Sequence, residues 1–190
     1  MILEILLILL AISFFVVIST MGWWIGTYNK FRNAQQDINT MWSDIKTEYQ
    51  RRADLFYNLV QAVKSYKNFE KDTLVKVTEA RTGFGKMASK MAEMKKMKGL
   101  DAFFNKLMVT VEKYPNLKAY KQHDSLMKEI RITEDRINVA RTSYNDIVGS
   151  YNKMVTMFPS SFVASHHNFK NEEFYVNEES SNTAPKIDLG

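Results

Sequence analysis

No charged residue occurs between Glu4 and Lys30, where residues 5–29 read ILLILLAISFFVVISTMGWWIGTYN. A helix of these 25 residues is about 37 Å long, enough to cross a hydrocarbon core of about 30 Å with some tilt. A cleaved signal peptide would need a basic start, a shorter apolar core and a cleavage site between small residues, and none of these is convincing here. We therefore expect residues 1–29 to be a retained transmembrane anchor.

The C-terminal end of this apolar run has the residues typical of a membrane interface. Trp23, Trp24 and Tyr28 carry amphipathic rings that favour the headgroup region, and the basic residues Lys30 and Arg32 follow them. Positive charge flanking a membrane span usually stays in the cytoplasm. We expect the chain after residue 29 to be cytoplasmic, with the lipid bilayer as its first partner.

Beyond the anchor, apolar residues recur at alternating steps of three and four, the pattern of one helix face. The first series consists of Tyr28, Phe31, Gln35, Ile38, Trp42, Ile45, Tyr49, Arg52, Phe56, Leu59, Val63 and Tyr66. Its register can be continued to Met94, and no proline occurs before Pro115. We expect a very long first helix with a bend or short turn near residues 67–69 or near Gly83 and Gly85.

A second series predicts a helix of about 35 residues that stops at Pro159. It consists of Leu126, Ile130, Thr133, Ile137, Ala140, Tyr144, Ile147, Tyr151, Met154 and Phe158. Between the two series, Leu100 to Glu112 has helical spacing, with Asp101 as a plausible cap and Tyr114-Pro115-Asn116 as a turn. A spacing of 3.5 residues also predicts left-handed supercoiling, as in a coiled coil.

These elements predict an all-α protein, because seven Gly and three Pro in 190 residues are too few for a sandwich or barrel. The expected architecture is an N-terminal transmembrane helix that continues into an elongated antiparallel helical bundle over residues 30–159. Residues 160–190 form an aromatic and then acidic C-terminal segment. Its aromatic side chains are expected to dock on the bundle, whereas residues 171–190, with a net charge of −4, are expected to be loose.

The overall net charge of +5 is too mild to demand nucleic acid as a partner. The charge is distributed unevenly. When Glu4 and the acidic tail are set aside, residues 30–170 carry a net charge of +10. A basic body of this kind is compatible with anionic lipid at a cytoplasmic membrane surface.

Several polar residues fall at or near the apolar seams of the two helices. They are Arg51, Arg52, Asp54, Asn58, Glu134 and Arg136. Such a cluster is either a ligand-binding or proton-handling site, or a partly buried ion-pair network that fixes helix register. We favour the second interpretation, because structural networks perturb carboxylates just as functional sites do.

Two further patterns have a structural and a functional interpretation. Met87, Met91, Met94 and Met97 lie among five lysines and suggest either bundle core or a groove for a partner or a membrane; core is the simpler interpretation. The Tyr-Asn pairs at residues 144–145 and 151–152 share one helix face and are better explained by interhelical hydrogen bonds than by a ligand.

No motif for catalysis or for a cofactor is present. The chain has no cysteine, and His123, His166 and His167 lack the spacing of a zinc site. Gly83-x-Gly85 lacks the third glycine and the lysine of a phosphate loop. We therefore expect no enzyme activity, no metal and no cofactor.

The order and spacing of several short motifs resemble the LemA family of bacterial proteins over nearly the whole chain. These motifs are Tyr28-Asn29, Trp42-Ser43-Asp44-Ile45, Arg51-Arg52-x-Asp54-Leu55, Asn58-Leu59-Val60, Val63-Lys64-Ser65-Tyr66, Glu79-Ala80-Arg81, Glu112-Lys113-Tyr114-Pro115, Thr133-Glu134-x-Arg136-Ile137-x-Val139-Ala140-Arg141, Tyr144-Asn145-Asp146, Tyr151-Asn152, Phe158-Pro159, Phe169 and Ala184-Pro185-Lys186. Two positions depart from the family pattern: Tyr57 replaces a proline, which suggests an unkinked helix, and His166-His167 replace an apolar pair.

The resemblance implies one N-terminal transmembrane helix, a helical bundle and a place in the bacterial inner membrane. One branch of the family is associated with organising bacterial organelle membranes. We expect a structural or oligomeric scaffold that self-associates at the membrane. The alternative is a membrane-tethered signalling adaptor that stays monomeric until a protein partner, which the sequence does not name, arrives.

Overall fold

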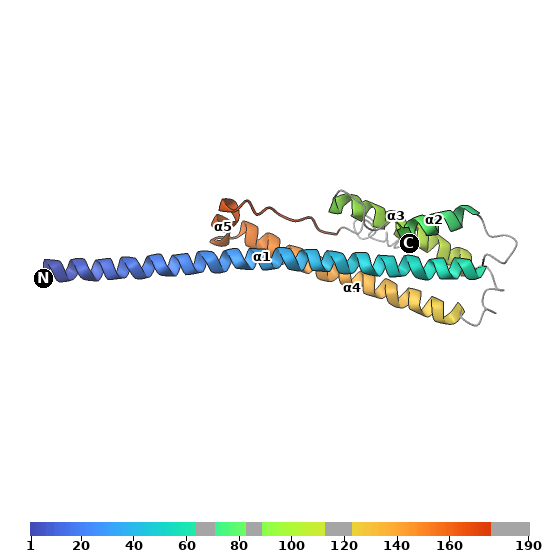
Figure 1. The fold of residues 1–190 in the computed structure, drawn as a ribbon, viewed down its shortest axis with the longest axis horizontal. Coiled ribbons are helices and arrows are strands. Elements are labelled where there is room, and N and C mark those ends of the chain that lie inside the picture. The colour runs from blue at the N-terminus through green and yellow to red at the C-terminus, as the bar shows by residue number, and fades with distance from the viewer. Residues whose placement is uncertain (64–70, 83–88, 113–122, 176–190) are drawn as a thin grey trace, which may run out of the picture. The chain divides into compact units, whose positions relative to one another are not determined.

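The computed structural model describes residues 1–63, 71–82, 89–112 and 123–175. These residues form five helices and no strand, which confirms the all-α prediction (Figure 1). The helices are α1 (Ile2–Val63), α2 (Lys71–Thr82), α3 (Lys90–Glu112), α4 (His123–Thr156) and α5 (Ser160–His166). The bends expected near residues 67–69 and 83–85, and the turn at 114–116, lie outside the described residues.

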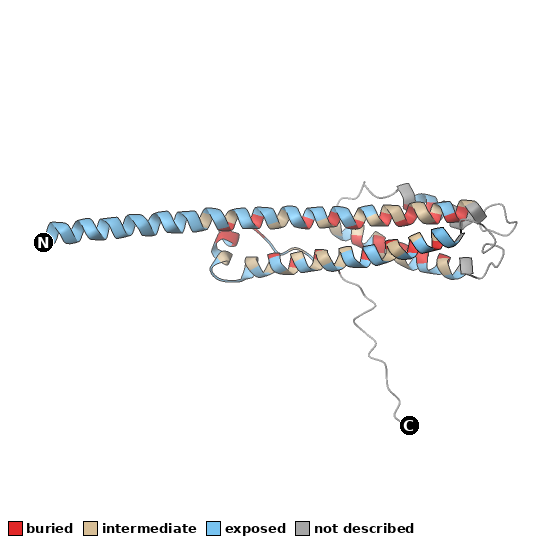
Figure 2. Cartoon of the chain, turned by 90° about the horizontal axis from the view of Figure 1, so that it is seen from below, coloured by how far each residue is buried: buried red, intermediate tan, exposed pale blue. Residues whose placement is uncertain are grey.

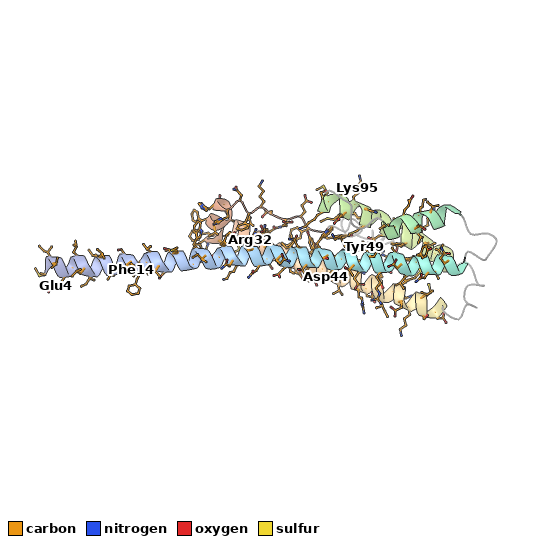
Figure 3. All side chains as sticks on the ribbon, viewed as in Figure 1. Glu4, Phe14, Arg32, Asp44, Tyr49 and Lys95 are labelled. Carbon is orange, nitrogen blue, oxygen red and sulfur yellow. The ribbon has the colours of Figure 1, made fainter. Side chains whose placement is uncertain are left out.

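Helix α1 has two chemically different parts within one uninterrupted helix. Its N-terminal part is strongly apolar, and the large hydrophobic side chains from Ile2 to Ile18 are exposed. Figure 2 shows this end exposed, and Figure 3 shows Phe14 pointing away from the helix with no protein around it. Helix α1 is therefore long and apolar enough to cross a membrane, and nothing in the described chain covers its apolar residues.

The second part of α1 buries the face that the first apolar series predicted. Every member of that series from Phe31 to Leu59 is buried except Gln35, which is half-buried. The helix runs without a break past Tyr57, as expected for a sequence without a proline at this position. The regular steps of three and four keep this face pointed toward the partner helices.

The chain divides into two compact units, and α1 and α4 contribute to both. Unit 1 comprises Met1–Thr40 and Tyr144–Gly190, and unit 2 comprises Met41–Ser143. In unit 1, α1 and α4 meet at Phe31 and Tyr151, whose rings lie edge to face with 5.9 Å between their centroids. In Figure 1, α5 lies beside α1 in this unit.

Unit 2 contains an apolar core cluster. Helices α1, α2, α3 and α4 each bury residues in one cluster, which consists of Ala53, Phe56, Leu59, Val60, Val77, Ala80, Leu100, Phe104, Leu107, Met127 and Ile130. The rings of Phe56 and Phe104 stack with 4.5 Å between centroids. The methionine stripe contributes as well, since Met94 and Met97 are buried, although Met91 is exposed and Met87 lies outside the described residues.

The prediction of a separate helix from Leu100 with Asp101 as its cap is wrong. Helix α3 begins at Lys90, and Ser89 caps it by accepting a hydrogen bond from the backbone N–H of Ala92 at 3.3 Å. The apolar register of Met94 and Met97 runs on without a break into Leu100, so packing continues the helix through Gly99. Asp101 is therefore an interior residue of α3 that faces other helices.

Three predictions for the C-terminal region also need correction. Phe158, the last member of the second series, is exposed because α4 ends at Thr156. The length of α4, 34 residues, agrees with the prediction. The stretch after Pro159 begins with a short helix, α5, that no periodicity indicated. Residues 171–175 belong to the acidic segment expected to be loose, yet Tyr175 is buried; residues 176–190 lie outside the described part of the chain.

Candidate functional site: a charged cluster and an asparagine clamp

A cluster of charged and polar side chains lies within unit 2, where α1, α3 and α4 face one another. Helix α1 supplies Tyr49 and Arg52, α3 supplies Asp101, and α4 supplies Arg141 and Glu134. The side chains of Arg52 and Arg141 are 4% and 11% exposed, and that of Asp101 is 23% exposed. An unpaired charge that is buried to this extent destabilises the folded state. The way these charges pair therefore determines whether the cluster is a structural network or a site for a ligand.

Asp101 is the centre of the cluster. Its Oδ1 accepts a hydrogen bond from Arg52 Nη1 at 3.1 Å, and its Oδ2 accepts one from Tyr49 Oη at 2.8 Å. Arg141 Nη2 donates to both Asp101 Oδ2 and Tyr49 Oη. One carboxylate thus holds two guanidinium groups from two different helices.

Aromatic rings lie beside both guanidinium groups. The Arg52 guanidinium carbon lies 5.1 Å from the centroid of the Phe104 ring, and that of Arg141 lies 5.4 Å from the centroid of the Tyr49 ring. These distances suit cation–π attraction. Glu134 completes the balance of charge, because one of its carboxylate oxygens lies 3.8 Å from Arg52 Nη2. Asp101 pairs with both arginines and Glu134 with Arg52, so these contacts join side chains of three helices.

A second contact of the same kind lies closer to the start of α3. Trp42 Nε1 donates a hydrogen bond to Glu93 Oε2 at 2.6 Å, and Lys46 Nζ lies 3.8 Å from Glu93 Oε1. Trp42 and Tyr49 are seven residues apart on α1, and Glu93 and Asp101 are eight apart on α3. Each spacing is about two helical turns, so two acidic groups of α3 meet two aromatic donors on one face of α1.

In unit 1, two asparagines of α4 hold the extended segment that follows α5. Asn145 Nδ2 donates to the backbone carbonyl of Tyr175 at 2.9 Å, and its Oδ1 accepts the backbone N–H of Tyr175 at 2.7 Å. Asn152 makes the same pair of hydrogen bonds with Glu172, at 2.9 and 2.8 Å. We call this arrangement the asparagine clamp.

The spacing of the clamp follows from the geometry of helix and extended chain. Asn145 and Asn152 are seven residues apart, which is about 10.5 Å of helix rise. Glu172 and Tyr175 are three residues apart, which is about 10 Å of extended chain. The two lengths match, so asparagines seven residues apart on α4 can each bind the backbone of one residue in the extended segment. Tyr151 makes an interhelical hydrogen bond, which it accepts from Gln35 at 3.4 Å, whereas Tyr144 donates to the backbone carbonyl of Glu173 at 3.0 Å.

Comparison with known proteins shows what kind of chain carries these features. The profile of the LemA family matches residues 41–189, which include the whole charged cluster and the whole asparagine clamp. The chain belongs to the LemA family.

Individual relatives have modest identity to this LemA-family chain but long coverage. Magnetosome protein MamQ 2 of Paramagnetospirillum magneticum is 25% identical over 201 residues, covering 92% of this chain and 74% of the relative. Protein LemA of Metamycoplasma hominis is 29% identical over 142 residues, covering 74% and 65%. Magnetosome protein MamQ of Magnetospirillum gryphiswaldense is 24% identical over 202 residues, covering 93% and 74%.

The six polar residues singled out in the sequence of this LemA protein separate into different contacts. Arg52 and Glu134 lie together in the charged cluster. The other four are distributed as follows: Arg51 donates to Glu129 at 2.7 Å, Arg136 pairs with Glu48 at 3.8 Å, Asp54 accepts from Gln50 at 3.5 Å, and Asn58 is exposed. Tyr49, Asp101 and Arg141 were not singled out as cluster members, although Tyr49 lies in the first apolar series and Arg141 in a family motif.

The five predicted interface residues lie along α1 in unit 1. Trp24 Nε1 donates to His167 Nε2 at 3.3 Å, and the ring of Tyr28 lies 4.6 Å from that of His167, centroid to centroid. Trp23, Lys30 and Arg32 are exposed, and Arg32 donates to Gln35 at 3.3 Å. The histidine pair of this LemA chain thus packs on aromatic rings. Within the described residues, no group of three or more His, Asp or Glu side chains is placed to hold a metal ion.

We expect the deprotonation of Tyr144 to lower the free energy of unfolding at alkaline pH. Burial, followed by the charges of Glu172 and Glu173, raises the pKa of Tyr144 from 10.0 to about 12. Because the folded state holds this proton more tightly than the unfolded state, the contribution is complete below pH 10 and is lost as the pH rises toward 12. Thermal unfolding followed by circular dichroism should show that the Tm of Tyr144→Phe falls less between pH 10 and pH 12 than the Tm of the parent protein. An equal fall in Tm for both proteins would contradict this assignment.

Proposed function

We propose that this LemA-family protein is a single-pass protein of the bacterial inner membrane whose cytoplasmic helical bundle acts as a scaffold by self-association. The observation that carries the proposal is the continuity of α1. One helix without a break contains an apolar part that no described residue covers and a part that forms the core of the bundle. In this proposal α1 tethers the bundle to the bilayer, and tethering raises the effective concentration of one copy beside another.

A groove between α1 and α4 in unit 2 offers a surface for a second copy. It encloses about 520 Å³, and its apolar lining residues are Met41, Ile132, Val139 and Ala140. Val139 is 65% exposed, which is high for a valine beside other apolar groups. Asp44, Glu48, Asp135 and Arg136 also line the groove.

Anchored copies share one membrane and one orientation, which favours a two-fold axis along the membrane normal. Such an axis brings the same groove of two copies together. The charged side chains around the groove are the carboxylates of Asp44, Glu48 and Asp135 and the guanidinium of Arg136, which lies 3.8 Å from Glu48 of its own chain. The exposed apolar side chain of Val139 and the shared orientation of anchored copies support a second copy as the occupant.

We expect Val139→Glu to weaken self-association by about tenfold or more, which corresponds to about 1.4 kcal/mol. The new carboxylate adds negative charge to an acid-rich rim, and the fold should be unaffected because the side chain is exposed and Glu is a good helix former. The matched control is Val109→Glu on α3, where the valine is 53% exposed. Sedimentation of the full-length protein in detergent measures the association constant, and equal effects of both substitutions would exclude the groove as the interface.

We expect the bundle to face the cytoplasm. Because the chain has no cysteine, Lys95→Cys on α3 introduces a single thiol at an exposed site (Figure 3). This thiol should react with a membrane-impermeant reagent only after permeabilisation, whereas Leu3→Cys at the other end of the anchor should react in intact cells. The reverse pattern would overturn the orientation that Lys30 and Arg32 predict.

A further inference from the structure

Large apolar side chains are exposed at the corner between α4 and α5. Met157, Phe158 and Phe162 are 60%, 78% and 62% exposed, and the rings of Phe158 and Phe162 lie edge to face with 5.8 Å between centroids. We call these three residues the corner patch. The opposite side of α5 is packed, because Val163 and Ala164 are buried. A contiguous apolar cluster beside a packed face is typical of an interaction surface.

Contacts within unit 1 place this corner level with the end of the apolar run of α1. The His166 ring lies 5.4 Å from the Trp24 ring, centroid to centroid, and His167 accepts the hydrogen bond from Trp24. Trp24 is five residues before Asn29, where the uncharged run ends, which is about 8 Å of helix rise. Figures 1 and 2 both show α5 beside the middle of α1, where its exposed N-terminal part ends. The corner patch is therefore at the depth of the membrane interface if α1 spans the bilayer.

The charge of the surrounding chain is compatible with a lipid surface. No Asp or Glu occurs from residue 147 to residue 171. Lys153 and Lys170 lie in this interval, and both are exposed. No acidic side chain in the interval would repel an anionic headgroup, and each lysine near such a surface contributes favourably.

We propose that the corner patch inserts into the boundary between headgroups and acyl chains of the membrane that α1 crosses, with anionic headgroups around Lys153 and Lys170. This inference rests on the proposed membrane anchor. The insertion gives the protein a second contact with the bilayer beside the spanning helix, as amphipathic surface segments do. Two contacts on one compact unit restrict the rotation of α1 about its own axis, which a single spanning helix leaves free.

The test uses the full chain in vesicles of phosphatidylcholine and phosphatidylglycerol, with one cysteine at a time carrying an environment-sensitive fluorophore. Phe162→Cys and Met157→Cys report on the corner patch. Phe14→Cys reports on the anchor. The matched control is Phe174→Cys, because Phe174 is also an exposed phenylalanine of unit 1 but lies against Gly149 of α4, which comes eight residues before Met157 in the chain. Lipids that carry a spin label at a shallow or a deep acyl position serve as quenchers.

We expect the shallow label to quench the probes at positions 162 and 157 several-fold more than the probe at position 174, and the deep label to quench the probe at position 14. Quenching at position 14 together with equal quenching at 162, 157 and 174 would overturn the insertion while leaving the anchor intact. A blue-shifted but unquenched probe at position 162 would also overturn it, because protein would then cover the patch. Absence of quenching at position 14 would overturn the anchor and the insertion together.

Discussion

Replacing Asp101 with alanine should destabilise the protein by about 3 kcal/mol or more. The substitution removes the carboxylate that Arg52 and Arg141 share and leaves both guanidinium groups largely buried. Removing one partner of a buried ion pair costs more than the pair contributes, because the remaining charge stays desolvated. Arg52→Ala should cost somewhat less, since Asp101 keeps Arg141 and Tyr49 as partners. Urea unfolding of the full-length protein in detergent measures both values.

The control for this experiment is Lys95→Ala, an exposed position of α3, which should stay within about 0.5 kcal/mol. Asp101→Asn separates the charge from the shape of the side chain, because the amide oxygen still accepts a hydrogen bond. Small and equal effects of Asp101→Ala and Lys95→Ala would mean that the cluster is solvated and does not fix helix register.

Phe104→Ala should cost about 3–5 kcal/mol, since it removes a fully buried ring from the core of unit 2. The ring stacks on Phe56 and lies beneath the guanidinium of Arg52. Its loss therefore leaves a cavity and also removes the aromatic surface on which the charged cluster rests. The same urea unfolding experiment measures the change in free energy.

The matched control is Phe103→Ala, because Phe103 is the adjacent residue of α3 but only partly buried. It should cost clearly less than Phe104→Ala. Equal losses would indicate that α3 is rotated about its axis relative to the arrangement described above.

The long helices follow from the sequence because regular steps of three and four specify the face that each helix buries. That is why the first apolar series predicts the buried residues of α1 from Phe31 to Leu59, and why Arg52 stands out as a charged residue within it. The partners of Arg52 are harder to predict. Asp101 becomes a partner only when α3 starts at Lys90 and turns that residue inward, and an acidic residue after Gly99 has equally good local reasons to be a cap.

Helix α5 and the asparagine clamp could not be predicted from the local sequence pattern either. Helix α5 has seven residues, too few for a periodic pattern to be distinguished from chance. The asparagine clamp depends on the match between helix rise and the rise of an extended segment twenty or more residues away in the chain. The Tyr-Asn repeat indicates that something regular binds one face of α4, but it does not distinguish a helix from an extended backbone.

The central claim, a self-associating membrane scaffold, is tested most directly by the protein mass of the full-length chain in lipid nanodiscs, measured by light scattering with the lipid contribution subtracted. The chain has a mass of 22.1 kDa. The scaffold predicts one defined multiple of this mass, shifted toward the single chain by Val139→Glu and unchanged by Val109→Glu. The mass of a single chain in lipid would contradict the scaffold and favour a tethered adaptor that waits for a protein partner.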